Sequence, residues 1–155
     1  MVSYIFEGMS DRKLTIEGGL KLQYYWNKNW TLQSDAYYDL LNVSDGLHGS
    51  FFVSRNFGND KWKLTPSIGV NWEDQNYVDY YYGVKNSEVN SDRDEYHPGF
   101  SINPFVECTY IHFWGDNWAS YLRATGNYLD QEIQDSPLVD KKVSFSFLAA
   151  FVYRF

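Results

Sequence analysis

The last stretch of the sequence reads Val143-Ser-Phe-Ser-Phe-Leu-Ala-Ala-Phe-Val-Tyr-Arg-Phe155. Every second residue from Val143 to Phe155 is apolar, while Ser144, Ser146 and Arg154 fall between them. Side chains of a β-strand point alternately to its two faces, so the pattern predicts a strand with one apolar, aromatic face. An open strand of this kind invites aggregation in water, whereas a barrel in lipid turns the apolar face outward. The stretch therefore predicts a strand of a transmembrane β-barrel.

The composition is rich in aromatic side chains yet polar on average. Aromatic residues make up 20% of the 155 residues, while the mean hydropathy is −0.50. No apolar run reaches the roughly 18 residues that a transmembrane helix needs. Strands that face lipid on one side and a polar interior on the other reconcile these facts. We therefore expect a single outer-membrane β-barrel domain over residues 1–155.

The charge and the cysteine content exclude several kinds of site. The net charge is −7 without a basic cluster, which argues against nucleic acid as a partner. The single cysteine, Cys108, rules out an internal disulfide and a multi-cysteine metal centre. The acidic stretch 73–99 lacks the regular Asp spacing and the Gly of a calcium loop. We therefore expect a solvated loop there, and neither a metal nor a cofactor.

The rest of the chain repeats the alternating pattern and predicts an all-β, antiparallel, up-and-down transmembrane barrel of about eight strands. The predicted strands cover residues 2–9, 14–26, 30–40, 49–57, 62–72, 100–113, 118–128 and 143–155. Three short turns, which follow Trp26, Phe57 and Trp114, alternate with longer loops. Outer-membrane barrels have short periplasmic turns and longer external loops. We therefore expect loops 73–99 and 130–142 outside, and Phe155 on the periplasmic side.

The segment 62–72 shows the pattern most cleanly, because Trp62 and Trp72 lie at the two ends of its apolar face. Tilted by roughly 40°, the segment covers about 25 Å of the membrane normal, which matches the apolar band of such barrels. Proline has no backbone N–H to donate within a sheet. We therefore expect a bulge at Pro66 and another at Pro104.

A soluble barrel of the lipocalin kind, apolar inside and polar outside, is the alternative interpretation. Alternation alone does not distinguish the inside of a barrel from its outside. The tryptophans at the strand ends and the apolar last strand favour lipid. In that setting Tyr153 and Phe155 are expected to form the assembly signal at the end of the last strand.

Charged residues fall on the face opposite the apolar one in most of the predicted strands. The hairpin around the turn 27–29 places Lys21 opposite Asp35. Charges in a narrow, dry lumen must pair, because an isolated buried charge is costly. We therefore predict two luminal pairs, Lys21 with Asp35 and Glu107 with Arg123.

Several short motifs follow one another in a recognisable order. They read Leu64-Thr-Pro-Ser-Ile-Gly-Val-Asn-Trp72, Tyr80-Tyr-Tyr-Gly-Val84, Tyr96-x-Pro98, Asn117-Trp118, Asp135-Ser-Pro-Leu-Val-Asp140 and Tyr153-Arg-Phe155, with Met9-Ser-Asp-Arg12 upstream. Their combination resembles the MltA-interacting protein (MipA/OmpV) family over residues 9–155. Family members begin with a signal peptide and further strands, so we expect this chain to be the C-terminal portion of such a protein, a fragment of a larger barrel.

The resemblance implies an outer-membrane β-barrel. It implies a scaffold that brings a murein lytic transglycosylase together with a bifunctional murein synthase, with outer-membrane lipid around the barrel. Other family members are linked to adhesion or to antibiotic response. An adhesin, or a small-molecule-responsive barrel that acts through its external loops, is therefore the alternative function.

Two histidines raise the question of catalysis at the external rim. His48 is close in sequence to Asp45 and Ser50, and His97 is close to acidic neighbours. Such groups support nucleophilic or acid–base chemistry only if they converge. Ordinary polar loop residues are the better interpretation, so we do not predict an enzyme.

The external loop 73–99 contains a cluster of three tyrosines followed by glycine. Clustered tyrosines suit interfaces, so Tyr80, Tyr81, Tyr82 and Gly83 form a candidate binding patch. The same cluster is equally compatible with a segment that folds back and caps the mouth of the barrel.

Overall fold

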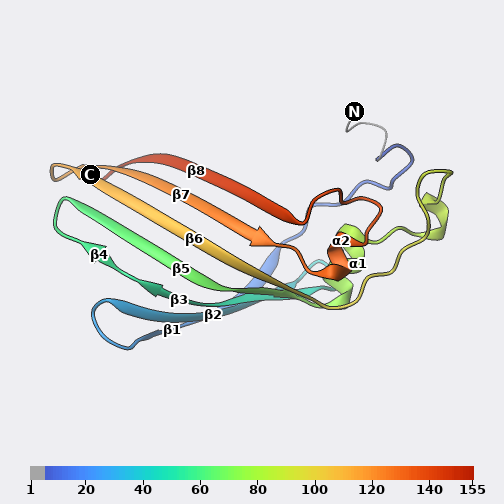
Figure 1. The fold of residues 1–155 in the computed structure, drawn as a ribbon, viewed down its shortest axis with the longest axis horizontal. Helices are drawn as coiled ribbons and strands as arrows, with labels where there is room; N and C mark the ends of the chain where they lie inside the picture. The colour runs from blue at the N-terminus through green and yellow to red at the C-terminus, as the bar shows by residue number, and fades with distance from the viewer. Residues whose placement is uncertain (1–5) are drawn as a thin grey trace.

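The computed structural model describes residues 6–155, and most of them form one antiparallel sheet (Figure 1). The strands are β1 (Glu17–Tyr25), β2 (Trp30–Asp39), β3 (Leu47–Arg55), β4 (Phe57–Gly58), β5 (Trp62–Glu73), β6 (Ser101–Trp114), β7 (Trp118–Tyr128) and β8 (Val143–Tyr153). They pair in the order β1-β2-β3-β5-β6-β7-β8, and β4 pairs with β5. The predicted all-β, antiparallel up-and-down architecture is therefore confirmed. Over the described residues the sheet is open, because β1 and β8 do not pair.

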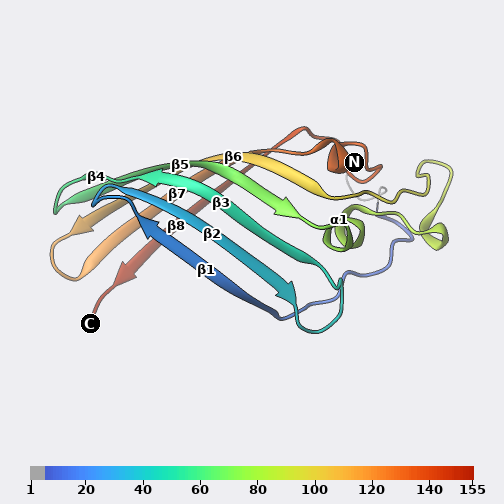
Figure 2. The same ribbon diagram turned by 90° about the horizontal axis from the view of Figure 1, so that it is seen from below.

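The sheet is strongly curved, so it encloses a trough rather than a flat surface (Figure 2). Its outward face is apolar: Leu20 is 80% exposed, Phe147 is 81% exposed, and Val106 and Ile68 are also exposed. Its inward face carries polar side chains such as Ser50, which line a cavity. The predicted division of the strands into an apolar outer and a polar inner face is confirmed.

The first hairpin has the predicted register, with Lys21 opposite Asp35 and Gln23 opposite Gln33. Its turn is held by the side chain of Asn27, whose Oδ1 accepts hydrogen bonds from the backbone N–H groups of residues 29 and 30 at 2.8 and 3.1 Å. Asparagine favours such turns because its short side chain bonds its own backbone two residues on.

The predicted bulges at the prolines are wrong, because no residue is inserted at either position. β3 and β4 pair with β5 in the same register, as the pairs Ser54↔Ser67 and Phe57↔Leu64 show. The pairing is interrupted between these two pairs, beside Pro66. Likewise the ladder between β6 and β7 ends at Phe105, next to Pro104. The missing N–H of proline thus removes a backbone hydrogen bond between neighbouring strands without changing their register.

The predicted strand 2–9 is also wrong over its described part. Residues 2–5 lie outside the described residues, and Phe6 to Gly8 form a turn. The chain then runs without regular structure to Glu17. The eighth strand of the sheet is instead the short β4. It is distinct from β3 because the pairing with β5 is interrupted beside Pro66.

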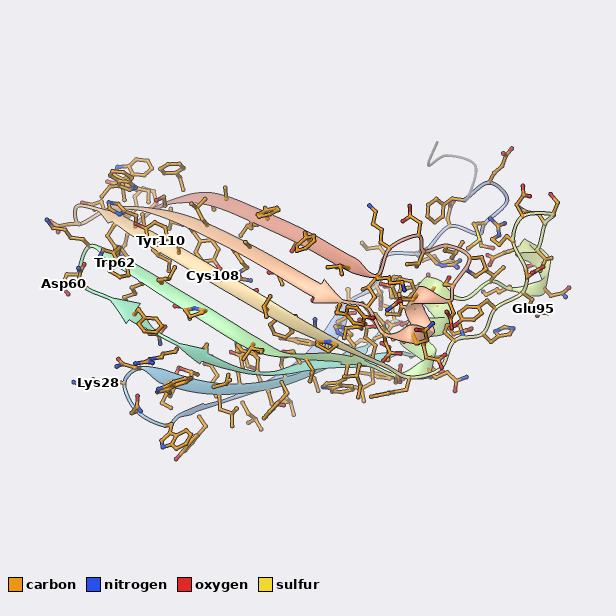
Figure 3. The ribbon with its side chains drawn as sticks, viewed as in Figure 1. Lys28, Asp60, Trp62, Glu95, Cys108 and Tyr110 are labelled. Carbon is orange, nitrogen blue, oxygen red and sulfur yellow. The ribbon has the colours of Figure 1, made fainter. Side chains whose placement is uncertain are left out.

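Short turns and long loops lie at opposite ends of the strands, as predicted. Figure 3 shows Lys28 and Asp60 of the short turns at one end, and Glu95 of the longest loop at the other. We call these the short-turn end and the long-loop end.

The long loops contain two helices, α1 (Gln75–Tyr82) and α2 (Gln131–Gln134), as well as a 3-10 turn at Asn86–Glu88. Each α-helix begins at an aspartate: Asp74 accepts a hydrogen bond from the N–H of Tyr77, and Asp130 accepts one from Glu132. Aspartate is among the preferred N-cap residues for this reason. Among residues 6–155, neither helix is long and apolar enough to cross a membrane.

Candidate functional site

The inward face of the sheet surrounds a cavity of about 630 Å³, which we call the luminal trough. Its side chains come from β1, β2, β3, β5, β6 and β7, and most are hydroxyl or amide groups. Three lining side chains are charged: Lys21, Glu107 and Arg123. The rings of Phe52 and Phe105 meet edge to face at 5.8 Å within the lining.

Asp35 lies opposite Lys21, but its carboxylate is taken up by other donors. Oδ1 accepts hydrogen bonds from the N–H and the hydroxyl of Ser50 at 2.9 and 2.8 Å. Oδ2 accepts one from Gln33 at 3.1 Å. Among the described residues, no carboxylate lies within ion-pair distance of the Lys21 ammonium group. The predicted pair is thus adjacent across the ladder without forming an ion pair.

Glu107 and Arg123 lie diagonally across β6 and β7, since their direct partners are Thr125 and Thr109. Arg123 Nε is 3.6 Å from Glu107 Oε1, and Glu107 Oε2 accepts a hydrogen bond from Thr125 at 3.0 Å. The guanidinium group lies over the ring of Tyr121 at 5.3 Å, and its side chain is 45% exposed. A long, single contact of this kind leaves most of the guanidinium donors available to a ligand.

The long loops pack together at the long-loop end, and we call residues 74–100 and 129–142 the cap. Val78, Val84 and Ile133 are buried at its centre. The two loops are joined by hydrogen bonds to Glu132, whose Oε2 accepts from the N–H of Gly99 at 2.7 Å and whose backbone carbonyl accepts from Tyr96 at 2.9 Å. The cap therefore has a small apolar core of its own.

The cap rests on the inward face of the sheet at the long-loop end. The ring of Tyr77 on α1 lies 4.6 Å from that of His48 on β3. Asn103 on β6 accepts a hydrogen bond from the N–H of Asp130 at 2.7 Å and is itself buried. Burial raises the pKa of Tyr77 above its ordinary value. The cap thus covers the inward face of the sheet at the long-loop end.

Residues 9–16 cross the outside of the cap, and we call them the strap. The N–H of Ser10 donates to Glu88 Oε1 at 2.9 Å, and Arg12 Nη1 is 3.4 Å from the same oxygen. Lys85 N–H donates to Glu88 Oε2 at 3.1 Å. Burial raises the pKa of the Glu88 carboxyl, but these hydrogen bonds and the Arg12 charge outweigh it and lower the pKa to about 2. Sequence reasoning missed this carboxylate, because its partners lie far apart in the chain.

The tyrosine cluster belongs to the C-terminal half of α1, and its side chains are half-buried. The hydroxyl of Tyr80 accepts a hydrogen bond from the strap at 2.7 Å, and the ring of Tyr81 lies 4.7 Å from that of Tyr77. The carbonyl of Tyr82 accepts a hydrogen bond from Ser136 at 2.6 Å. The cluster therefore lies within the cap. The role of Tyr80, Tyr81, Tyr82 and Gly83 as a binding patch stays a prediction.

His48 has a partner that is distant in sequence, whereas His97 contacts its sequence neighbour Glu95 as well as Asp79. His48 Nε2 lies 3.1 Å from a carboxylate oxygen of Glu17 on β1. His97 lies between Asp79 at 2.9 Å and Glu95 at 3.3 Å on the exposed surface of the cap. The hydrogen bonds to Asp79 and then to Glu95 raise the pKa of His97. Over residues 6–155, no group of three or more His, Cys, Asp or Glu side chains is placed to hold a metal ion.

The short-turn end has an excess of positive charge. Its cations are Lys28, Arg55, Lys61, Lys63 and Arg154, and its carboxylates among the described side chains are Asp60 and Asp116. Arg55 faces outward and stacks between the rings of Trp30 and Phe57, at 5.2 and 4.6 Å. Stacking on aromatic rings stabilises a cation at the boundary between lipid and water.

Aromatic rings gather around the same end. Tyr153 lies 4.8 Å from Trp118 and 4.9 Å from Phe155, and Trp114 lies 4.2 Å from His112. Such rings form the girdle at the interface of outer-membrane barrels. The role of Tyr153 and Phe155 as an assembly signal stays a prediction.

An apolar outer face, a polar inner face, an aromatic girdle and alternating short turns and long loops define the class of transmembrane β-barrel proteins. Within that class, the chain belongs to the MltA-interacting protein family. The family model described as MltA-interacting protein MipA matches residues 3–155.

Curated relatives place the family in the outer membrane. YiaT of Escherichia coli (strain K12) is 30% identical over 154 residues, which are 98% of this chain and 62% of YiaT. The MltA-interacting protein of the same strain is 30% identical over 148 residues, which are 95% of this chain and 59% of that protein. Outer membrane protein OmpV of Vibrio cholerae serotype O1 is 25% identical over 149 residues, which are 96% of this chain and 58% of OmpV.

The chain is therefore an outer-membrane protein of the MipA/OmpV type. It spans about three fifths of the length of these relatives. No solved structure matches it.

Proposed function

We propose that the protein is an outer-membrane scaffold without chemistry of its own, which presents its short-turn end to murein enzymes in the periplasm. The observation that carries the proposal is the similarity to a relative named MltA-interacting protein. By family resemblance, the partners are a murein lytic transglycosylase and a bifunctional murein synthase. Lipid covers the apolar outer face of the sheet, because no other solvent suits that face.

The short-turn end supports this role through its charge. Lys28 and Lys61 project from two of the three turns, and few carboxylates lie near them. A surface with an excess of one sign of charge steers a partner of the opposite sign and orients it. A stable interface buries about 800 Å² on each partner. A single turn is smaller than that, so we propose that the turns 27–29, 59–61 and 115–117 act together.

The test is capture of a murein lytic transglycosylase from detergent-solubilised envelopes, with the tagged chain as bait and an immunoblot as the readout. We expect capture by the unchanged chain, and loss of capture when the three turns are replaced by Gly-Ser. The double variant Lys28→Gln, Lys61→Gln is expected to weaken capture, particularly at low salt.

The matched control is the double variant Lys141→Gln, Lys142→Gln, which removes the same charge from the long-loop end. It is expected to capture as much as the unchanged chain. Each variant is first shown to be folded by a difference in gel mobility with and without boiling. Equal capture by the folded turn variant and the unchanged chain would contradict the proposal.

An external role through the long loops is the second candidate. The tip of the loop between β5 and β6 is exposed, including the apolar side chain of Val89 at 43%. A loop tip that is exposed to solvent is accessible to an external partner. Adhesion that is lost when the exposed Val89 is replaced by Ser, together with unchanged capture of the transglycosylase, would favour this candidate.

A further inference from the structure

We propose that the luminal trough binds small anionic solutes between Lys21 on β1 and Arg123 on β7, and that these solutes reach it from the short-turn end. Both cations line the same cavity of about 630 Å³. A cavity of that volume lies within the range of about 300 to 1,000 Å³ that is usual for sites of small molecules.

Asp35 and Lys21 lie opposite each other, but within residues 6–155 only the carboxylate of Asp35 has partners for its charge. The carboxylate oxygens of Asp35 accept hydrogen bonds from Ser50 and Gln33. The ammonium group of Lys21 lacks an ion-pair partner among the described residues, although Asp35 lies opposite. Lys21 is exposed to the trough, so its positive charge is accessible to an anion that enters there and attracts it.

The ion-pair contact of Arg123 is a single long one, from Nε to Glu107 at 3.6 Å, which leaves guanidinium donors available. The second oxygen of Glu107 is occupied by Thr125. Arginine binds carboxylate and phosphate with two parallel hydrogen bonds from this fork. Arg123 therefore keeps donors available for an anion beside its single long contact with Glu107.

The other lining groups define the rest of the ligand. Neutral amides lie on the inward face, where Asn71 donates to Asn127 at 3.1 Å. Phe52, Phe105 and Tyr121 add flat apolar surfaces within the same lining. The ligand that fits this lining is a small molecule with a carboxylate or phosphate group, and the rest of the molecule is partly polar and partly apolar.

The direction of access follows from the two ends. The cap covers the inward face at the long-loop end through Tyr77 against His48 and Asp130 against Asn103. The short turns are too brief to fold over the other end. Lys63 points inward there, over the ring of Phe113 at 5.7 Å, and adds positive charge on the way in. In an outer-membrane barrel this end faces the periplasm.

The test is calorimetric titration of the whole chain in detergent micelles with three separate probes: citrate, inorganic phosphate and tetramethylammonium chloride. We expect saturable binding of citrate, of phosphate or of both, and none of tetramethylammonium. Lys21→Gln and Arg123→Gln are each expected to weaken binding about ten-fold, the usual effect of losing one hydrogen bond to a charged group. Lys141→Gln, in the cap, is the charge-matched control and is expected to bind like the unchanged chain.

The substitution Glu107→Gln distinguishes two roles of Arg123: binding an anion, or forming an ion pair with Glu107 that is only structural. Removing the competing carboxylate is expected to tighten anion binding by about three-fold if Arg123 holds the anion. Weaker binding after Glu107→Gln would overturn the proposal. Folding of each variant is checked by gel mobility, and Lys21→Met, which also removes the charge, replaces Lys21→Gln if that variant does not fold.

The two anions distinguish the sources of the ligand. Binding of citrate alone assigns a carboxylate ligand, and binding of phosphate alone assigns a phosphorylated one. Binding of neither anion to a folded chain, or equal binding of tetramethylammonium, would show that the trough is not an anion site. Binding that the substitutions at Lys21 and Arg123 leave unchanged would also refute it.

Discussion

At the scale of single residues, the buried carboxylate of Glu88 joins three parts of the chain. It accepts hydrogen bonds from the strap at Ser10 and from Lys85, and it lies beside Arg12. Glu88 is only 2% exposed. A carboxylate with these donors prefers the charged form, in spite of its burial, because a proton added to one oxygen weakens the hydrogen bonds that this oxygen accepts.

Protonation of Glu88 is expected to release the strap in acid. Its pKa is lowered from an ordinary 4.5 to about 2. A lowered pKa means that the charged form stabilises the fold, so this contribution is present above pH 4.5 and is lost as the pH falls towards about 2. Limited proteolysis of the strap across this pH range is the measurement, with cleavage expected to increase towards the acidic limit.

The substitution Glu88→Gln is expected to release the strap at neutral pH as well. The amide carries no charge for Arg12, and its NH₂ group cannot accept from one of the two backbone donors, which costs roughly 1–3 kcal/mol. The variant should also lose the acid-dependent increase in cleavage. The exposed Glu95→Gln serves as control. Cleavage of the strap that is equally slow in Glu88→Gln and in the unchanged chain would contradict this account.

At the scale of elements, close approach of neighbouring strands depends on glycine. A Cβ added at Gly49 on β3 would lie 2.7 Å from Trp72 on β5 and 2.1 Å from the carbonyl of Asp35 on β2. The indole of Trp72 therefore covers the space above Gly49, across the strand pair. An aromatic side chain that lies over a glycine in this way fixes the register of a sheet.

Gly49→Ala is expected to destabilise the sheet by about 1–3 kcal/mol, the usual cost of overpacking. The expected result is a lower urea midpoint for unfolding from micelles, followed by tryptophan fluorescence. Gly99→Ala is the matched control, because the nearest atom to an added Cβ there is 3.5 Å away on a flexible side chain. If the two variants unfold at the same urea concentration, steric contact with Trp72 does not limit this position.

The elements that the sequence predicted are those that depend on local pattern. The seven long strands, the hairpin register and the alternation of turn length follow from period-two alternation and from turn residues such as Asn27. The cap could not be predicted in this way. Asp74 and Asp130 are the signals for its helices, but each helix is short and is stabilised by contacts with the other loop.

The strap and the trough were missed for the same reason. Residues up to Phe6 show the alternation of a strand, but the chain beyond them follows the cap instead, because Glu88 binds Ser10 from far along the sequence. Similarly, Asp35 lies opposite Lys21 as predicted, yet Ser50 on the next strand takes its carboxylate. Which side chain bonds which partner depends on distances in the folded structure, and the alternating sequence pattern carries no information on these distances.

At the scale of the whole molecule, charge is distributed unequally along the strand direction. The loop 73–99 carries Glu73, Asp74, Asp79, Glu88, Asp92, Asp94 and Glu95 against only Lys85 and Arg93. The short-turn end has the opposite sign. A molecule polarised in this way attracts anions and acidic surfaces at one end only, which is why the proposed partner and the proposed solute both approach from the short turns.

The direction of the edge strands limits how the open sheet can close. Strand direction alternates from β1 to β8 through five intervening long strands, so β1 and β8 both run towards the short-turn end. A direct ladder between them would be parallel. A second copy with its short turns on the same side would also meet these edges in parallel. Closure by antiparallel ladders therefore takes an odd number of further strands.

We expect the 155-residue chain to be monomeric in micelles, with its two edges unpaired. Hydrogen exchange followed by NMR is the measurement. Amides of β5 and β6, which have neighbours on both sides, should exchange slowly, because each must break a ladder bond to open. Alternate amides of β8 that point away from β7 should exchange fast, and likewise those of β1 that point away from β2. Slow exchange along both edges, with the mass of two copies in the micelle, would show that parallel edges do pair and that strand direction does not govern closure.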